Sequence, residues 1–588
     1  MLARSYSIAL WIAVAAQAST AAAATTSPAR AASAEPTFVG QVAPLLRTHC
    51  LMCHRAGSSE GALPLATYEQ ASAHAEQVLR AVESGAMPPW PIDALHSAPM
   101  RDDPRLSATE IDVLRAWLSA GLPRGTRREA APEPPPVGWA GTQHPPPDDI
   151  ISLPTFSIPA QGELPYQQIL IKVNFKEDRW IAALQVLPGN PAVVHHMGIA
   201  ELRLPAGVGP QQIRDLAHVA AKLGLPPDAL IQAQPAIIDT LSGGYDMLAA
   251  YTPGEAYESL PSGTGKLLKA GENNYVNFNI HYTTIGQATS DQSRLALWYL
   301  RTPPKRQVYR TPSAGRTILA EGHELYPDDP GSKAEGTDVA IPPIPPYASD
   351  YELVGITGYE RPVTLYSFQP HAHLRAKDFR YDLIYPDGRT RTLLSIPKYE
   401  YHRQLDYYFA TAVEAPAGSK LVVTAHYDNS PANQHLREFS SINPTARCGP
   451  DKYAFFRPQN QTWDEMFSPI VQFAIDDVQA TDESAHLPLV AVRGCLVSDG
   501  SLDASHTWEL VHASRPQRAL SQTITRAELP DTTRTRGTQR YSLIGLEPFR
   551  PAALKGARVL VKGVKIPQGD SARINVTALQ ELGGECDK

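Results

Sequence analysis

Two histidines separated by one residue, His371 and His373, come at the end of the strand-like run 363–368. Residues i and i+2 of a strand point to the same face, so this pair can offer two imidazoles to one metal ion. For an isolated pair, the alternative is two polar side chains on a solvated strand face. The choice between a metal site and a polar surface therefore depends on whether the chain has further residues with metal-binding side chains.

Three more histidines and a methionine favour the metal site. His195 and His196 are adjacent, and His281 lies in the alternating run 276–282, turned away from the apolar side of that run. Met466 comes later in the chain. A thioether combined with imidazoles suits copper, particularly Cu(I), better than zinc. Neighbouring residues of a regular strand face opposite ways, so joint ligation by His195 and His196 requires a bulge or a strand end.

These stretches resemble the copper type II ascorbate-dependent monooxygenases, the family of peptidylglycine and dopamine hydroxylases. The resemblance covers roughly residues 150–480 and implies two antiparallel β-sandwich domains of jelly-roll type, residues 150–305 and 306–480. It implies one copper on the first domain and a second copper on the second domain, on facing sides of one crevice. The first set of ligands is then His195, His196 and His281, and the second set is His371, His373 and Met466.

The resemblance also implies dioxygen chemistry. O2 is expected to react at the second copper, where a substrate C–H bond is hydroxylated, while the first copper supplies the second electron. The expected catalytic residues are therefore His371, His373 and Met466. In the peptide hydroxylases an arginine two residues before the His-x-His pair helps to hold the substrate's carboxylate, and here that position is Gln369. A less acidic small organic substrate is therefore an equal alternative to a peptide.

The N-terminal part carries a haem-attachment pattern. Cys50, Cys53 and His54 form Cys-x-x-Cys-His, in which two thiols bond covalently to a haem c and the histidine binds the iron. Met87 follows in a Met-Pro-Pro segment similar to those of small cytochromes c and is the expected second axial ligand, with a core methionine as the alternative. A Met/His pair raises the haem potential and suits electron transfer.

Residues 36–125 are expected to form an all-α cytochrome c domain. Residues 67–70 and 107–110 fit capping boxes at the starts of two helices, of which the second ends at Gly121. Residues 126–149 are rich in proline, which predicts a semi-rigid linker that lets the domain dock without fixing it.

Residues 1–24 combine Arg4, an apolar run and an alanine-rich end, which indicates a secretory signal peptide. The run is short for a membrane span, so a soluble periplasmic or secreted protein is expected, with a short membrane anchor as the alternative. The net charge of -7 gives no reason to expect nucleic acid or an anionic membrane as a partner. Outside the haem motif lie Cys448, Cys495 and Cys586; a Cys495–Cys586 disulfide is favoured because this pair brackets the last domain.

Residues 485–588 contain five short strand-like runs, which predict a small β-barrel of the OB type. In the second β-domain, the turn at 386–388 predicts a hairpin, and His426 is a candidate extra ligand, with a hydrogen-bonded structural histidine favoured. In the first β-domain, a helix-like run is expected at 213–223, and loops near the first metal at 244–247 and 251–254.

The chain is therefore expected to be an exported monooxygenase with two copper ions and one covalently bound haem c. It would use O2 and a small organic substrate. The haem domain would pass electrons to the first copper, in place of or beside an ascorbate-like reductant, or with a respiratory redox protein as donor.

Two other functions stay open. One is a non-catalytic periplasmic electron-transfer or copper-binding protein, although its blue-copper version needs a cysteine beside two histidines. The other is a cytochrome fused to carbohydrate-binding β-modules with surface histidines, which predicts no tightly bound copper.

Overall fold

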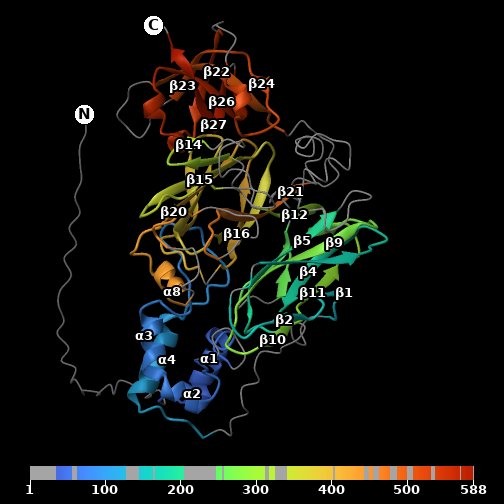
Figure 1. The fold of residues 1–588 in the computed structure, drawn as a ribbon, viewed down its shortest axis with the longest axis vertical. Coiled ribbons are helices and arrows are strands. Elements are labelled where there is room, and N and C mark those ends of the chain that lie inside the picture. The colour runs from blue at the N-terminus through green and yellow to red at the C-terminus, as the bar shows by residue number, and fades with distance from the viewer. Residues whose placement is uncertain are drawn as a thin grey trace, which may run out of the picture.

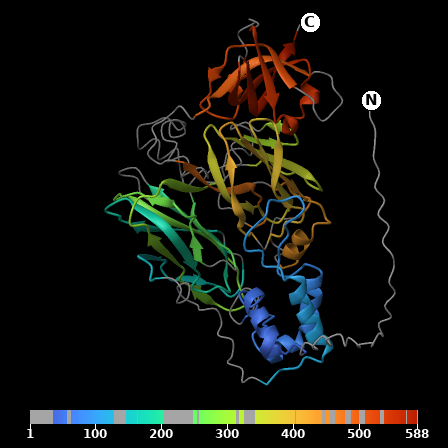
Figure 2. The same ribbon diagram turned by 180° about the vertical axis from the view of Figure 1, so that it is seen from behind.

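The computed structural model describes residues 35–55, 63–126, 145–162, 164, 166–203, 247–253, 257–311, 317–324, 341–401, 404–442, 449–454, 462–476, 486–498, 508–530, 537–569 and 571–586. Strands account for 45% and helices for 14%, so the protein is mainly β, with several sheets. A helical unit lies at one end and the C-terminal sheet at the other (Figures 1 and 2). The expected signal peptide, the helix-like run 213–223, Cys448 and most of the linker lie outside the described residues.

The N-terminal unit is helical in its described residues. It consists of the π-helical turn η1 (Phe38–Val42) and the helices α1 (Ala43–His49), α2 (Tyr68–Ala73), α3 (Ala75–Glu83) and α4 (Ala108–Ser119). The predicted capping boxes at 67–70 and 107–110 are confirmed. The helix predicted from residue 67 breaks at His74 into α2 and α3. Leu46, Leu114 and Trp117 contribute to a separate apolar core of this unit.

The first β-domain packs two sheets around one apolar core. Its strands are β1 (Asp149–Ser152), β2 (Phe156–Ile158), β3 (Gln167–Val173), β4 (Arg179–Leu187), β5 (Val194–Arg203), β6 (Met247–Tyr251), β7 (Tyr257–Ser259), β8 (Thr264–Leu268), β9 (Asn274–Tyr282), β10 (Thr289–Asp291) and β11 (Arg294–Tyr299). One sheet has the order β3-β9-β5-β6, and β1-β11-β4-β8 lies in the other. Side chains of both sheets meet in the core, as Ile181, Ile199 and Phe278 illustrate.

The second β-domain repeats this two-sheet arrangement. Its elements are β12 (Arg306–Thr311), β13 (Thr317–Ala320), β14 (His323–Glu324), β15 (Tyr351–Gly358), β16 (Val363–His371), β17 (Ala376–Ile384), β18 (Thr390–Ile396), β19 (Tyr407–Ala415), β20 (Lys420–Tyr427), α8 (Gln434–Ile442) and β21 (Ser468–Asp476). One sheet has the order β14-β13-β15-β20-β17-β18, and the other contains β12-β21-β16-β19. The predicted β17–β18 hairpin is confirmed, with Gly388 at φ 91° in its turn.

The two β-domains share a continuous sheet. β8 of the first domain pairs in parallel with β12 of the second, which joins the strands into the order β1-β11-β4-β8-β12-β21-β16-β19. Arg310 of β12, only 2% exposed, reinforces this junction with ion pairs to Glu258 of the first domain and Asp406 of the second. The two domains are therefore joined by backbone pairing as well as by buried charge.

The chain between α3 and α4 is built into the second β-domain. Residues 92–101, here called the strap, hydrogen-bond to both β18 and β19, each of which is the last strand of its sheet. The N–H groups of Asp93 and Ala98 donate to β18 carbonyls at 2.9 and 3.0 Å, and the carbonyl of Pro99 accepts from β19 at 2.9 Å. Ile92 and Ala98 are buried in that domain's core. Because the strap pairs with otherwise open sheet edges, it fixes the helical unit in place, which the linker prediction did not foresee.

The C-terminal module is a closed ring of strands. Its elements are β22 (Leu489–Ser498), β23 (Trp508–Ala513), β24 (Gln517–Arg518), η6 (Arg526–Glu528), β25 (Gln539–Ile544), η7 (Glu547–Phe549), η8 (Pro551–Leu554), β26 (Ala557–Gln568) and β27 (Ser571–Glu585). β22 pairs with β23, β23 with β25, β25 with β27, β27 with β26, and β26 again with β22. The five predicted strands and the favoured Cys495–Cys586 disulfide are confirmed. No helix among the described residues is long and apolar enough to cross a membrane.

Candidate metal centres

His195 and His196 lie side by side because β5 carries a bulge. Val194 pairs with Tyr282 and His196 with His281, so His195 is an extra residue on β5. An extra residue in a strand re-aims the side chains around it. The Nδ1 atoms of the two neighbouring histidines are consequently only 2.9 Å apart. The bulge that joint ligation required is therefore present.

His281 completes the first set from the neighbouring strand. It lies on β9 directly opposite His196 of β5, and its ring centroid is 5.1 Å from those of both His195 and His196. Potential ligand atoms of the three residues lie within 4.8 Å of one another, a spacing that one metal ion can bridge. The three histidines predicted from the sequence thus come together at one point of the β5–β9 pair.

His371 and His373 lie at the end of β16 and in the turn after it, with ring centroids 5.7 Å apart. The side-chain nitrogen of Gln404 donates to two backbone carbonyls, so its oxygen accepts from His371 Nδ1 at 2.6 Å. His373 Nδ1 donates to the carbonyl of Asp464 at 2.9 Å. Such acceptors fix the tautomer of metal-binding histidines, because they leave the Nε2 lone pair available to a metal.

Burial keeps these imidazoles neutral. It lowers the pKa of His371 to about 4 and, with a smaller contribution from His371, the pKa of His373 to about 3. Burial and the neighbouring His195 hold the pKa of His196 well below its usual value. A neutral imidazole is the form that binds a metal. These three histidines therefore need not release a proton at pH 7 before they bind a metal.

Met466 is tied to His373 by the buried side chain of Glu465. Glu465 Oε1 accepts from the backbone N–H of His373 at 2.6 Å and from that of Met466 at 3.0 Å. Glu465 Oε2 accepts from the backbone N–H of Arg375 at 3.0 Å. Burial raises the pKa of Glu465 to about 7, while the charge of Arg375 opposes the rise. One carboxylate thus holds the methionine segment against the turn that carries the second pair of histidines.

Tyr166 lies between the two sets of histidines. Its hydroxyl is 3.1 Å from Nε2 of His196 and 3.3 Å from Nε2 of His373, and its ring stacks on His281 with centroids 4.7 Å apart. The ring centroids of His196 and His371 are themselves 5.6 Å apart. The expectation of two groups on facing sides of a crevice is therefore wrong for this structure, because the five imidazoles form one continuous cluster.

The contact between the domains explains why the two sets meet. The continuous sheet holds the domains together at β8 and β12, and the segment that carries Met466 bridges them near the cluster. Thr462 Oγ1 in this segment lies 3.0 Å from His281 Nε2 of the first domain. The later residues Asp464 and Glu465 contact His373 of the second. One short segment therefore contacts both histidine sets.

The Cys50–His54 turn has the donors that haem c attachment needs. The N–H groups of Cys53 and His54 both donate to the carbonyl of Cys50, at 3.1 and 2.8 Å, and neither thiol is in a disulfide. Burial raises the pKa of the Cys50 thiol to about 12, and nearby Cys53 adds to the rise. His54 Nδ1 donates to the carbonyl of Leu63 at 3.1 Å, so Nε2 is the nitrogen that could bind iron.

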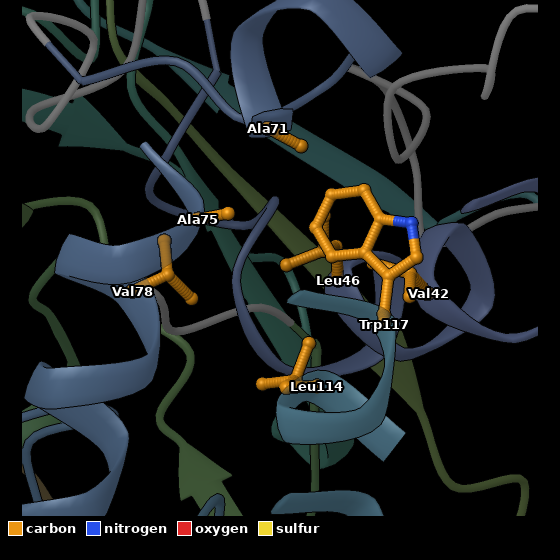
Figure 3. A pocket seen from close by; sticks show the side chains of 7 residues that line it. All are labelled: Val42, Leu46, Ala71, Ala75, Val78, Leu114 and Trp117. Atoms are coloured by element: carbon orange, nitrogen blue, oxygen red, sulfur yellow. The ribbon is translucent and has the colours of Figure 1, made fainter. Parts of the chain in front are cut away.

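The helices beside this turn present an apolar interior. Seven side chains from η1 and α1 to α4, among them Leu46, Val78 and Trp117, converge on a cavity of about 10 Å³ (Figure 3). This volume holds about one water molecule, so a haem would have to move these side chains apart or cover them from outside. The thiol and imidazole donors and the apolar surroundings both suit a haem. Met87 is half-buried in the turn after α3, and its role as second axial ligand stays a prediction.

Two other predictions concern residues outside the ligand sets. His426 Nδ1 donates to Asp378 Oδ1 at 2.8 Å, which supports the structural alternative for this histidine. The two loops expected near the first metal are wrong only at Met247 and Tyr251, which are the end residues of strand β6. Met247 is only 7% exposed there and fills space beside β5.

Sequence reasoning missed the residues that hold the ligands in place: Tyr166, Arg375, Gln404 and Glu465. Glu465 could have been found, because it directly precedes Met466 and an acidic residue in an otherwise buried segment needs a partner. Tyr166 had no comparable signal, since it lies 30 residues before His196 and 207 before His373.

A scan against protein-family models and a search of curated proteins found no match to this chain.

Proposed function

We propose that the chain is an exported copper- and haem-dependent monooxygenase that hydroxylates a C–H bond of a small organic substrate with O2. The observation that carries this proposal is the cluster of five imidazoles, with Glu465 joining the backbone of Met466 to that of His373. A three-histidine site beside a two-histidine, one-methionine site suits copper in both cases. Overall, R–H and O2 with two electrons and two protons give R–OH and water.

The residues divide into three ligand sets. The first copper would be held by His195, His196 and His281; the second by His371, His373 and Met466; and the haem c by Cys50, Cys53, His54 and Met87. Copper, when bound, supplies one-electron redox chemistry and reaction with O2, and a thioether favours Cu(I). Around it, Gln404 fixes the tautomer of His371, and the carbonyl of Asp464 fixes that of His373. Glu465 holds the methionine segment beside His373.

The finer identity of each domain belongs to the same proposal. We assign residues 36–125 to a cytochrome c domain, 150–305 and 306–480 to jelly-roll-like copper domains, and 485–588 to an OB-like barrel. The closed five-strand ring supports the barrel. The Cys495–Cys586 disulfide supports an oxidising compartment, either the periplasm or the cell exterior.

The surroundings of Gln369 favour a substrate without a carboxylate. Its side chain is 4% exposed; its oxygen accepts from Arg310 at 3.0 Å, and its nitrogen donates to the carbonyl of Gln404 at 3.1 Å. Arg310 is itself buried and paired with carboxylates. Neither residue is in a position to receive an acid group from a substrate, so peptidylglycine-type recognition at this position is disfavoured.

The decisive experiment measures metals, haem and O2 uptake in the exported protein. We expect one haem and two copper ions per chain, and O2 uptake with a reductant that rises when the right small organic molecule is added. Met466→Ile should lose one copper, whereas Met197→Ile should keep both. Met197 is a matched control because it is a buried methionine that packs in the apolar core and directly follows the His pair.

Two results would count against the proposal. Failure to bind copper tightly would leave a haem protein with buried histidines. Two bound coppers without substrate-stimulated O2 uptake would favour the non-catalytic electron-transfer or copper-binding alternative.

A further inference from the structure

The Met87–Trp90 turn of the helical unit touches the second β-domain directly. Trp90 comes three residues after Met87 and two residues before the strap begins, and its ring centroid is 5.1 Å from that of Tyr407. Tyr407 is the first residue of β19 and is only 2% exposed. The contact therefore joins the predicted haem-ligand turn to a buried ring of the β-sandwich.

The strap makes this contact a fixed one. Beside Trp90, the strap forms backbone hydrogen bonds with β18 and β19, and Ser395 of β18 donates to Ser97 Oγ at 2.9 Å. Arg101 at the strap's end lies over the ring of Tyr408, 4.2 Å from its centroid. Within the described residues, the hydrogen bonds of the strap to the β-domains all go to the second domain. The helical unit is thus held at the second domain's side of the molecule.

Tyr407 leads on to the second pair of histidines. It pairs in register with Phe368 of β16, three residues before His371. Along its own chain, Tyr407 lies three residues after Gln404, whose side chain accepts from His371 Nδ1 at 2.6 Å. Two short connections, one through β16 and one through Gln404, therefore run from the Tyr407 ring to His371.

We infer that electrons pass from the haem-binding unit through the Trp90–Tyr407 contact to the His371/His373/Met466 centre. This inference rests on the proposed function and changes one part of it, because the sequence-based expectation sent the electrons to the first copper. In each transfer, one ferrous haem becomes ferric and one Cu(II) becomes Cu(I), and no bond is made or broken. Electron transfer falls steeply with distance, and the two connections from Tyr407 lead to His371 of this centre.

The test mixes the anaerobic protein, fully loaded with Cu(II), with less than one equivalent of dithionite in a rapid-mixing instrument, and follows the absorbance of the haem as it is reduced and then oxidised by copper. We expect Trp90→Leu and Tyr407→Leu to slow haem oxidation several-fold without changing the haem spectrum or the copper content. Trp90→Phe, which keeps a ring, should recover part of the rate. Tyr408→Leu is the matched control: it removes the neighbouring ring at the same interface, but adjacent strand residues face opposite sides.

Removing one centre at a time identifies the acceptor. His371→Ala should abolish the fast phase of haem oxidation, whereas His281→Ala should leave that phase in place. The opposite pattern, or a wild-type rate in both Trp90→Leu and Tyr407→Leu, would overturn this route while leaving the proposed enzyme intact. A copper-loaded wild-type protein that never oxidises its haem would instead overturn the route and the proposed electron supply together.

Discussion

Arg375→Met should lower the free energy of unfolding by about 3–5 kcal/mol, the cost of leaving a buried ion without its partner. Arg375 is 1% exposed; its guanidinium donates to Asn429 Oδ1 at 2.7 Å and to the carbonyl of Trp463 at 2.8 Å. Its charge also stabilises the ionised form of buried Glu465. The methionine fills a similar space but satisfies none of these groups. Urea denaturation monitored at the β-domains measures the loss.

A double-mutant cycle separates the charge from the packing. Glu465→Gln alone should cost about 1–3 kcal/mol, because the amide group can no longer accept from all three backbone N–H groups. Arg375→Met combined with Glu465→Gln should cost less than the sum of the two single changes by at least about 1 kcal/mol. Additive costs would contradict the coupling, and a neutral Arg375→Met would show that the buried carboxylate does not depend on this guanidinium.

The metal-free protein should lose stability steeply as the pH falls from 6.5 to 4.5. Imidazoles of the unfolded chain gain protons around pH 6.5, whereas the folded pKa is about 4 for His371 and about 3 for His373, and that of His196 is also well lowered. The unfolded state therefore binds more protons, and stability falls with decreasing pH. Glu465 acts oppositely, since its raised folded pKa of about 7 favours the protonated folded state. Near pH 5 the unfolded state therefore binds about two more protons than the folded state: three more on the histidines and one fewer on Glu465. The free energy of unfolding then falls by about 3 kcal/mol for each pH unit of acidification.

Thermal unfolding midpoints of the metal-free and copper-loaded proteins across this pH range test the prediction. Bound copper should move the loss of stability to lower pH, because the metal occupies the nitrogen lone pairs that protons would otherwise take. His426→Gln is the control variant: the pKa of this histidine is raised, mainly by its hydrogen bond to Asp378, so His426 is charged in both states at pH 5. A midpoint that stays constant down to pH 4.5 in the metal-free protein would show that the cluster is already hydrated or protonated when folded.

Local sequence signals predicted much of the fold. The capping boxes at 67–70 and 107–110, the hairpin around Gly388 and the five strands of the C-terminal module depend on residues close together in the chain. The bulge at His195 was different: joint ligation by His195 and His196 required a bulge or a strand end, but no sequence pattern showed one. These features are predictable because short-range hydrogen bonding and side-chain periodicity determine them.

Contacts between distant segments were not predictable in the same way. The strap lies within the predicted cytochrome domain, yet it pairs with two sheet edges about 300 residues further along the chain, as the contact of Ser97 with Ser395 shows. Tyr166 reaches His373 across 207 residues. No sequence pattern in either segment predicts its partner, since any open sheet edge or ring nitrogen offers the same hydrogen bonds.

The sequence alone determined which chemistry was available: five imidazoles and a thioether in one order, and two thiols with a histidine in another. It also determined which residues start helices and which strands pair through tight turns. Only the tertiary structure decided that the two histidine sets form one cluster around Tyr166, and that the helical unit is fixed to the second β-domain. The reason is physical: spacing along a chain controls which groups share a face, whereas distances between domains depend on the packing of surfaces that lie far apart in sequence.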